Sequence, residues 1–117
     1  MKLVKGTYAP EKRPNMRGGE GTATVEAFIK EGTNGLPEKL RLYSRIYLPA
    51  GASIGYHVHE GEAEVFHFEA GKGRVKDDEQ VLTVEPGDVL ITTSGHGHSV
   101  ENIGDAELIL TAVIVKN

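Results

Sequence analysis

The chain has 117 residues, the size of one domain, and its content of 38% hydrophobic and 26% charged residues is typical of a folded globular protein. Its formal net charge of −4 without a basic segment argues against a nucleic-acid or anionic-membrane partner, and its lack of cysteine excludes disulfides, thiolate metal sites and cysteine nucleophiles. No apolar run approaches the ~20 residues of a membrane span, and no apolar segment follows the first lysine as in a secretory signal, so we expect a cytoplasmic protein.

Residues 1–21 are rich in proline, glycine and charge, and are expected to form an N-terminal arm or edge segment before one domain at 22–117. The arm ends in Arg-Gly-Gly-Glu-Gly at 17–21, and such glycines can cradle a phosphate group. The lysine and hydroxyl residue of a phosphate-binding loop are absent, and the following residues have the pattern of a strand rather than a helix. The glycines therefore predict a turn.

Short segments rich in β-branched and aromatic residues follow, separated by turns rich in glycine, proline and aspartate. None has a helical period over roughly 11 residues. The pattern predicts an all-β protein, an antiparallel sandwich or barrel. The expected strands are Thr22–Ile29, Leu40–Leu48, Glu64–Phe68, Arg74–Lys76, Gln80–Val84, Val89–Thr93, Ser99–Glu101 and Glu107–Val115.

The expected strand Leu40–Leu48 alternates between an apolar face and a polar-aromatic stripe of Tyr43, Arg45 and Tyr47, which Arg41 begins. This stripe could bind an anionic substrate, because an arginine side chain matches a carboxylate or phosphate group. It could equally be a solvent-facing or dimer surface, which is the interpretation that we prefer.

All five histidines lie between positions 57 and 98. His57 and His59 are two residues apart, so on an extended strand their imidazoles would point the same way and could reach one ion together. Imidazole suits Zn, Fe, Ni, Co, Cu and also Mn, and a carboxylate from a neighbouring strand would add an oxygen ligand. The pair is compatible with a metal site, but alone it is a weak signal, because surface pairs and histidines with structural hydrogen bonds are common.

Three glutamates and a further histidine follow this pair, and the first glutamate, Glu60, is expected in an exposed loop. Glu62 lies in the turn after the pair and is expected on the solvated surface, although it is the alternative ligand. Glu64 begins an apolar strand and shares one face with Phe66 and Phe68. The direction of its side chain is therefore better defined than that of Glu62. His67 falls on the opposite face and is expected to point away from the metal, in packing or a subunit interface.

The spacing of glycines around these residues resembles the cupin family. The first cupin motif, G-x5-H-x-H-x3–4-E-x6-G, is matched from Gly51 to Gly71. The second motif, G-x5-P-x-G-x2-H-x3-N, is matched at Gly87, Gly95, His98 and Asn102. Thr93 stands where the family usually has proline, but this departure affects a turn and not a ligand. The resemblance covers about residues 40–115.

The resemblance implies a double-stranded β-helix, or jelly-roll, cupin barrel over 22–117. It also implies one divalent transition metal (Mn, Fe, Ni, Co or Zn) held by His57, His59, Glu64 and His98. Three imidazoles and one carboxylate leave one or two coordination positions for water or a small-molecule ligand, as a catalytic site requires. Because small cupins usually pair through their barrels, a homodimer is expected as well.

Two functions are compatible with such a site. The first is a metal-dependent enzyme acting on a small sugar or organic acid, as an isomerase or a dioxygenase. An isomerase needs a base, for which His96 and Glu62 are the nearby candidates, and His96 would lie either at the pocket mouth or in an exposed loop. The alternative is a non-catalytic module that binds a small ligand or the metal.

Overall fold

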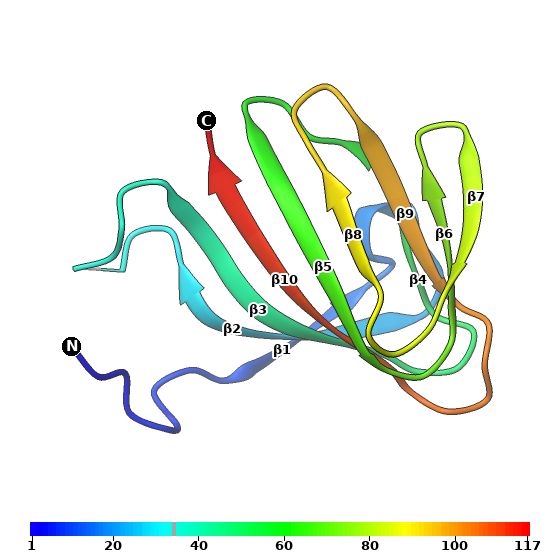
Figure 1. Ribbon diagram of the computed structural model, residues 1–117. Coiled ribbons are helices and arrows are strands. Elements are labelled where there is room, and N and C mark those ends of the chain that lie inside the picture. The colour runs from blue at the N-terminus through cyan, green and yellow to red at the C-terminus, as the bar shows by residue number, and fades with distance from the viewer. Residues whose placement is uncertain (34) are drawn as a thin grey trace.

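The computed structural model describes residues 1–33 and 35–117, which form two antiparallel sheets. The large sheet has the order β1-β2-β3-β10-β5-β8, and the small sheet has the order β4-β9-β6-β7. In Figure 1 the large sheet curves from β1 to β8, with the small sheet beside and behind it. The strands are β1 Pro10–Pro14, β2 Thr22–Lys30, β3 Leu40–Leu48, β4 Ser53–Val58, β5 Glu62–Ala70, β6 Gly73–Asp77, β7 Gln80–Val84, β8 Val89–Thr92, β9 Gly97–Asn102 and β10 Leu108–Lys116.

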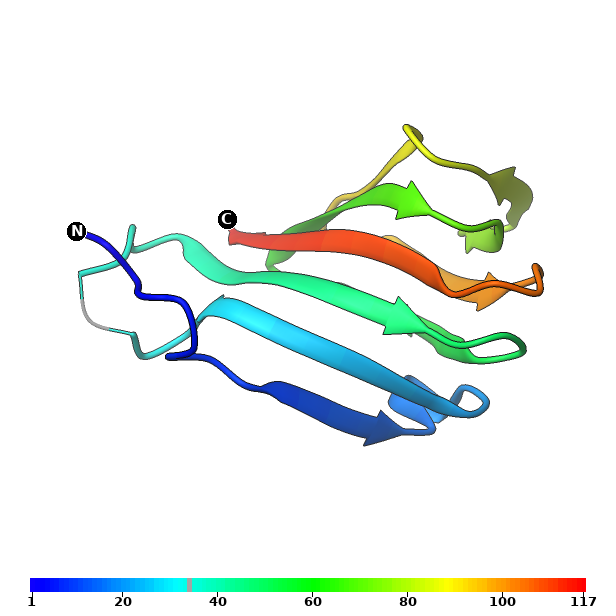
Figure 2. The same cartoon turned by 90° about the horizontal axis from the view of Figure 1, so that it is seen from below.

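The core lies between the two sheets. Figure 2 shows β1, β2, β3, β10 and β5 as one twisted layer. Alternate residues along β3, β5 and β10 are buried, and these face the small sheet. Burial of these apolar side chains is the main force that holds the sheets together. Large buried residues are Val25, Ile46, Leu48, Phe66, Phe68 and Leu110 from the large sheet and Ile54, Val75 and Val100 from the small one.

The all-β prediction is confirmed, and each of the eight expected strands is present. Two further strands were not expected. Strand β1 contains two prolines and three charged residues, and it is tolerated because it is an edge strand that pairs only with β2. Strand β4 is interrupted by Gly55. Within the described residues, the one helical segment is the 3-10 turn η1, Met16–Gly18, so no helix there could cross a membrane.

The expected turn at 17–21 is present and packs against β4. A Cβ atom at Gly19 would collide with the carbonyl of Ser53, and one at Gly55 would collide with the carbonyl of Arg17. The amide of Ser53 also donates a hydrogen bond to the carbonyl of Glu20 over 2.9 Å. Glycine is needed at both positions because the two backbones approach so closely, and the arm is thereby fixed against the small sheet.

The polar-aromatic stripe lies on the outer face of the large sheet. Arg45 donates a hydrogen bond to Glu69 over 2.9 Å, and the hydroxyl of Tyr47 donates to Glu26 over 2.7 Å. Tyr43 is 39% exposed. Since these groups bind partners on the same chain and none lines the cavity described below, the stripe is not part of the candidate site.

Candidate metal centre

The structure brings together the four residues that the cupin resemblance implied as ligands. His57 lies on β4 and His98 on β9, directly opposite each other in the small sheet. Glu64 comes from β5 of the large sheet, and His59 follows the end of β4. One potential ligand atom from each residue lies within 4.8 Å of all the others, and only His57 is not fully buried. The cluster therefore joins the two sheets at one point.

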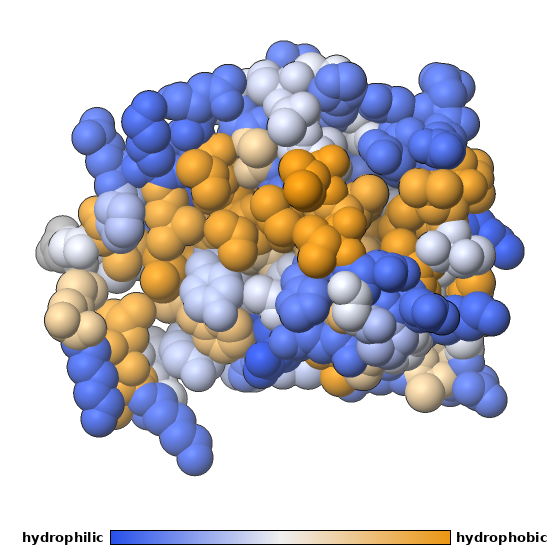
Figure 3. Space-filling model, viewed as in Figure 1, coloured by the Kyte–Doolittle hydropathy of each residue, from blue (hydrophilic) through white to orange (hydrophobic). Residues whose placement is uncertain are grey.

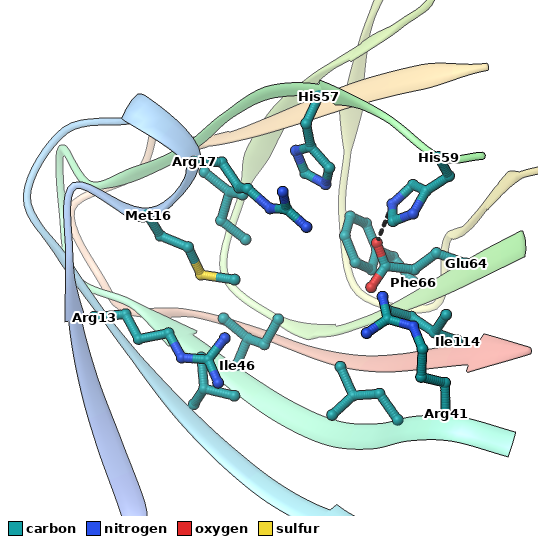
Figure 4. Close-up of a pocket in the computed structure, with 13 residues that line it drawn as sticks. Arg13, Met16, Arg17, Arg41, Ile46, His57, His59, Glu64, Phe66 and Ile114 are labelled. Atoms are coloured by element: carbon teal, nitrogen blue, oxygen red, sulfur yellow. Dashed lines mark hydrogen bonds and ion pairs between the residues drawn. The ribbon is translucent and has the colours of Figure 1, made fainter. Parts of the chain in front are cut away.

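The four ligand atoms have the separations that a shared ion requires. The Nε2 atom of His59 lies 2.9 Å from Oε1 of Glu64 and 3.2 Å from Nε2 of His98. The Nε2 atom of His98 lies 3.0 Å from Glu64 Oε1 and 3.2 Å from Nε2 of His57. Two atoms bound at right angles to one ion, each about 2.1 Å from it, would lie about 3.0 Å apart. Figure 4 shows the contact between His59 and Glu64 beside the cavity.

The other ring nitrogen of each histidine already has a partner. Nδ1 of His57 lies 2.8 Å from the carbonyl oxygen of Gly55, and Nδ1 of His59 lies 2.7 Å from a carboxylate oxygen of Glu62. Nδ1 of His98 lies 2.8 Å from the hydroxyl of Thr92. When each Nδ1 carries its proton, the three Nε2 lone pairs face one another and a carboxylate. Such an arrangement is repulsive unless protons or a cation lie between them, so the residues fit a divalent metal.

A bulge in β4 turns His57 toward this point. Opposite β9, Ile54 pairs with Val100 and His57 pairs with His98, so Gly55 and Tyr56 form a bulge. The bulge shifts the strand parity, and both Ile54 and His57 face the interior while Tyr56 is exposed.

His59 is held by the β8–β9 loop. Its amide donates to the carbonyl of His96 over 3.0 Å, and its carbonyl accepts from the amide of Gly95 over 2.7 Å. The glycine-rich loop before His98 therefore also fixes the backbone of a second candidate ligand.

The electrostatics of the cluster favour a buried cation. Burial lowers the pKa of His57, so its imidazole is neutral and able to bind a metal. The hydrogen bond to Glu64 raises the pKa of His59, with burial acting against it. Burial alone would raise the pKa of Glu64, but hydrogen bonds from His59 and His98 outweigh it and lower this pKa to about 2. The glutamate is therefore an anion at neutral pH.

These shifts predict how metal binding depends on pH. Binding requires neutral His59, whose pKa lies above the ordinary 6.5, so protons compete with the metal at and below neutral pH. We expect the apparent affinity for Zn²⁺ to rise with pH, by about tenfold per unit for each proton displaced, until His59 is neutral. Competition titrations with a chelator at pH 6, 7 and 8 would measure this. An affinity that does not change over this range would contradict it.

The expectation that Glu62 lies on the solvated surface is wrong. Strand β5 begins at Glu62, and this side chain is only 15% exposed. Besides its contact with His59, its carboxylate accepts two hydrogen bonds from Arg41, at 2.7 and 2.8 Å. The hydrogen bonds from Arg41 lower the pKa of Glu62, so it is charged and orients the imidazole of His59. Glu62 thus supports a candidate ligand and lies outside the four-residue cluster.

Arg41 reaches this position because a second bulge changes the parity of β3. Opposite β10, Leu40 pairs with Val115 and Leu42 pairs with Ile114, so Arg41 is the extra residue. It leaves the outer stripe expected from simple alternation and lines the cavity instead. Nothing in the sequence alone marks the position of this bulge.

Replacing Glu62 by glutamine should weaken metal binding by roughly 10- to 100-fold, because the neutral amide accepts less strongly from His59 and leaves Arg41 without its counter-charge. The neighbouring exposed Glu60 offers a matched control, and Glu60→Gln should leave the affinity within about twofold. Isothermal titration with Zn²⁺ would compare the two variants. An equal loss in both would contradict the role assigned to Glu62.

A cavity of about 100 Å³ lies beside the cluster. This space holds several water-sized molecules, and so a ligand with few heavy atoms. Its polar lining consists of His57, His59, Glu64 and three arginines, while the remaining lining is apolar. In Figure 4 the guanidinium groups of Arg13, Arg17 and Arg41 reach toward the open space between the side chains. None of these arginines was expected at the metal site from the sequence.

His96 and His67 lie outside the candidate site. Nδ1 of His96 contacts a carboxylate oxygen of Asp78 at 2.5 Å, its side chain is 54% exposed, and it does not line the cavity. It is therefore an exposed loop residue, as one of the two interpretations expected. His67 is exposed on the outer face of β5, opposite in direction to Glu64, as the parity predicted.

Comparisons with known proteins agree with this fold. Residues 44–114 match the family model of the cupin domain. An oxalate-binding protein from Thermotoga maritima is 39% identical over 115 residues, which are 98% of this chain and 93% of that protein. The crystal structure of a predicted oxalate decarboxylase from Thermotoga maritima has a TM-score of 0.91 and 36% identity, and the match covers 100% of both chains.

A more distant structure, KdgF from Halomonas sp., shares the fold at 10% identity, with a TM-score of 0.77 over 98% of this chain and 92% of that chain. The jelly-roll fold is thus confirmed together with the family. The chain belongs to the cupin family.

Proposed function

We propose that this protein binds one divalent transition metal through His57, His59, Glu64 and His98, and uses it to hold a small dicarboxylate of the oxalate type. The converging lone pairs of three imidazoles and one carboxylate support a metal from the series Mn, Fe, Ni, Co and Zn. A bound ion supplies positive charge and open coordination positions for oxygen atoms of the ligand. The protein would supply the apolar lining of the cavity and the positive charges that face the oxygen atoms of the ligand.

The observation that carries this proposal is the small basic cavity beside the cluster. Arg13 and Arg17 line it, and among the described residues neither forms an ion pair with a buried carboxylate, since Arg13 is paired with the exposed Glu11. Arg41, in contrast, is paired with Glu62. Two cationic side chains near a cation site favour an anionic ligand over a neutral sugar. The name of the 39% identical relative, an oxalate-binding protein, supports the same ligand class.

The cavity favours binding over catalysis by proton transfer. Apart from the candidate ligands, its titratable lining residues are the three arginines, whose pKa is too high for a general acid or base. Neither His96 nor Glu62, the bases considered from the sequence, lines the cavity of the described chain. A second candidate function, decarboxylation of oxalate at the metal, is suggested by the name of the 36% identical solved structure.

The test is titration of oxalate into protein loaded with Mn²⁺, Co²⁺ or Zn²⁺, followed by carbon NMR of ¹³C-labelled oxalate over hours. We expect saturable binding that depends on the metal, and oxalate that stays unchanged. Conversion of the label to formate and carbon dioxide would favour the second candidate. Absence of binding with every metal would overturn the proposed function.

We also propose that two copies of the chain associate through the outer face of the large sheet. Figure 3 shows apolar side chains gathered in a band across this face. Ile91 pairs with Val65, Val65 with Val113, and Val113 with Tyr43, which places one apolar row across four strands. Beside it, the charges of Arg45 and Glu69 neutralise each other. A two-fold interface brings a patch against itself, and an apolar row without net charge suits that symmetry.

A charged side chain introduced into this apolar row should cause the proposed dimer to dissociate. Ile91→Lys is expected to convert a dimer to a monomer in size-exclusion chromatography with light scattering, because lysine charges would meet across the two-fold axis. Val81 on β7 has the same exposure as Ile91, 62%, and lies outside the row, so Val81→Lys is the matched control and should remain dimeric. A monomeric wild type, or dissociation by Val81→Lys alone, would contradict this interface.

A further inference from the structure

We propose that Arg17, assisted by Arg13, binds the oxygen atoms of the ligand that face away from the metal, and so selects dicarboxylates over monocarboxylates. This inference rests on the proposed function and concerns the side of the cavity formed by the N-terminal arm. Both arginines lie in that arm, before the residues that match the cupin model. They would act as specificity-determining residues.

The N-terminal arm is fixed in place beside the site by hydrogen bonds. The amide of Asn15 donates to the carbonyl of Gly21 over 2.8 Å, and its side-chain amide donates to the carbonyl of Gly19 over 3.1 Å. Across to β4, the amide of Glu20 donates to the hydroxyl of Ser53 over 2.8 Å. These bonds close the turn and attach it to the strand that carries His57. The side chain of Arg17 is therefore presented from a fixed backbone.

The backbone of Arg17 has a conformation that is unusual for a residue with a side chain. Its φ of 55° and ψ of 29° lie in the left-handed region, which glycine adopts with less strain than any other residue. The neighbouring positions 18, 19 and 21 are glycines, yet this one carries a long cationic side chain. Strained backbone conformations of this kind cluster at functional sites, where the side chain binds a ligand or takes part in the mechanism.

The charge of the Arg17 guanidinium group is not neutralised by an ion pair among the described residues. Of the other two arginines at the cavity, Arg41 is paired with Glu62 and Arg13 with the exposed Glu11. Figure 4 shows Arg17 beside His57, with its guanidinium group directed into the cavity. The guanidinium group of Arg17 would lie close to a metal ion held by the clustered imidazoles. An anion bound between the two positive charges would stabilise both.

The geometry of a dicarboxylate meets this need. When one face of oxalate binds the metal, its remaining oxygens point outward, where a guanidinium fork can bind two of them. A monocarboxylate such as acetate presents a methyl group there instead. Arg17 should therefore contribute to the affinity for oxalate but little to the affinity for acetate.

The experiment compares Arg17→Gln and Arg17→Lys with wild type by calorimetry. The metal-free proteins are titrated with Zn²⁺, and the Zn²⁺-loaded proteins are titrated with oxalate and with acetate. We expect Arg17→Gln to bind Zn²⁺ normally and to lose roughly 10- to 100-fold in oxalate affinity, while its acetate affinity changes by less than about twofold. Arg17→Lys should recover part of the oxalate affinity, because it restores the charge without the fork. Arg13→Gln should show a smaller loss. Arg74→Gln on β6, an exposed arginine paired with Glu101, is the control and should match wild type.

Two outcomes would overturn the inference, and they are distinguishable. Normal oxalate binding by Arg17→Gln, or an equal loss for acetate, would overturn the role of Arg17 alone. Lack of oxalate binding by the metal-loaded wild type would overturn the proposed function and this inference with it. Side-chain NMR gives an independent readout, since oxalate should shift the Nε–H signal of Arg17 and leave that of Arg74 unchanged.

Discussion

Replacing His57 by alanine is expected to abolish stoichiometric binding of Zn²⁺ or Mn²⁺. Its Nε2 atom is one of four converging donors, and its Nδ1 atom is already committed to the carbonyl of Gly55. A four-ligand zinc site contributes roughly 10–16 kcal/mol in all, so loss of one ligand should weaken binding by at least about 100-fold. Because His57 is only half-buried, the fold should survive this change. Equilibrium dialysis with metal analysis would measure the effect.

The control for this experiment is His67→Ala. His67 lies on the outer face of β5, away from the cluster, so its removal should leave metal binding unchanged. Loss of metal in His67→Ala together with retention in His57→Ala would show that the assignment of ligands is wrong. Circular dichroism of both variants separates loss of a ligand from loss of the fold.

Replacing Phe66 by alanine should lower the free energy of unfolding of the metal-free protein by about 3–5 kcal/mol, the usual range for removing a buried aromatic ring. Phe66 is 2% exposed and lies between the two sheets. Its ring also stacks on the imidazole of His98, with ring centroids 4.6 Å apart and planes 13° apart. The change therefore leaves a void directly below the metal site. Urea denaturation in the presence of a chelator would measure the loss.

Phe28 is the matched control for this substitution. It is only partly buried and packs at the surface against Tyr8 and Tyr43, so Phe28→Ala should cost clearly less than Phe66→Ala. Equal losses would contradict the placement of the core between the two sheets. Metal affinity should fall in Phe66→Ala alone, because only Phe66 supports a candidate ligand.

The four clustered residues could be predicted from the sequence because their spacing matches the cupin motifs, and strand parity alone supported the direction of Glu64. His57 and His59 are two residues apart, and Glu64 begins an alternating strand whose parity the structure repeats. The pairing of His57 with His98 across two strands could not be derived from periodicity, since 40 residues separate them in the chain. The inclusion of His98 in the ligand set came from the resemblance to the cupin family.

The supporting residues could not be predicted because bulges and tertiary contacts place them. Simple alternation put Arg41 on the outer stripe, and a single extra residue in β3 moved it to the cavity. Gly61 and the local charge density predict an exposed position for Glu62, and the partner that buries it, Arg41, is 21 positions away. Arg13 and Arg17 belong to an arm without apolar periodicity, whose position depends on close backbone contacts at Gly19 and Gly55. The cytoplasmic location and the division at residue 21 stay predictions from the sequence.

The most direct test is a crystal structure of the protein grown with Mn²⁺ and oxalate, with anomalous scattering recorded for manganese. The account predicts one anomalous peak among Nε2 of His57, His59 and His98 and the carboxylate of Glu64, with oxalate density between this peak and Arg17. A manganese site elsewhere, or oxalate bound to protein without metal at this cluster, would contradict it.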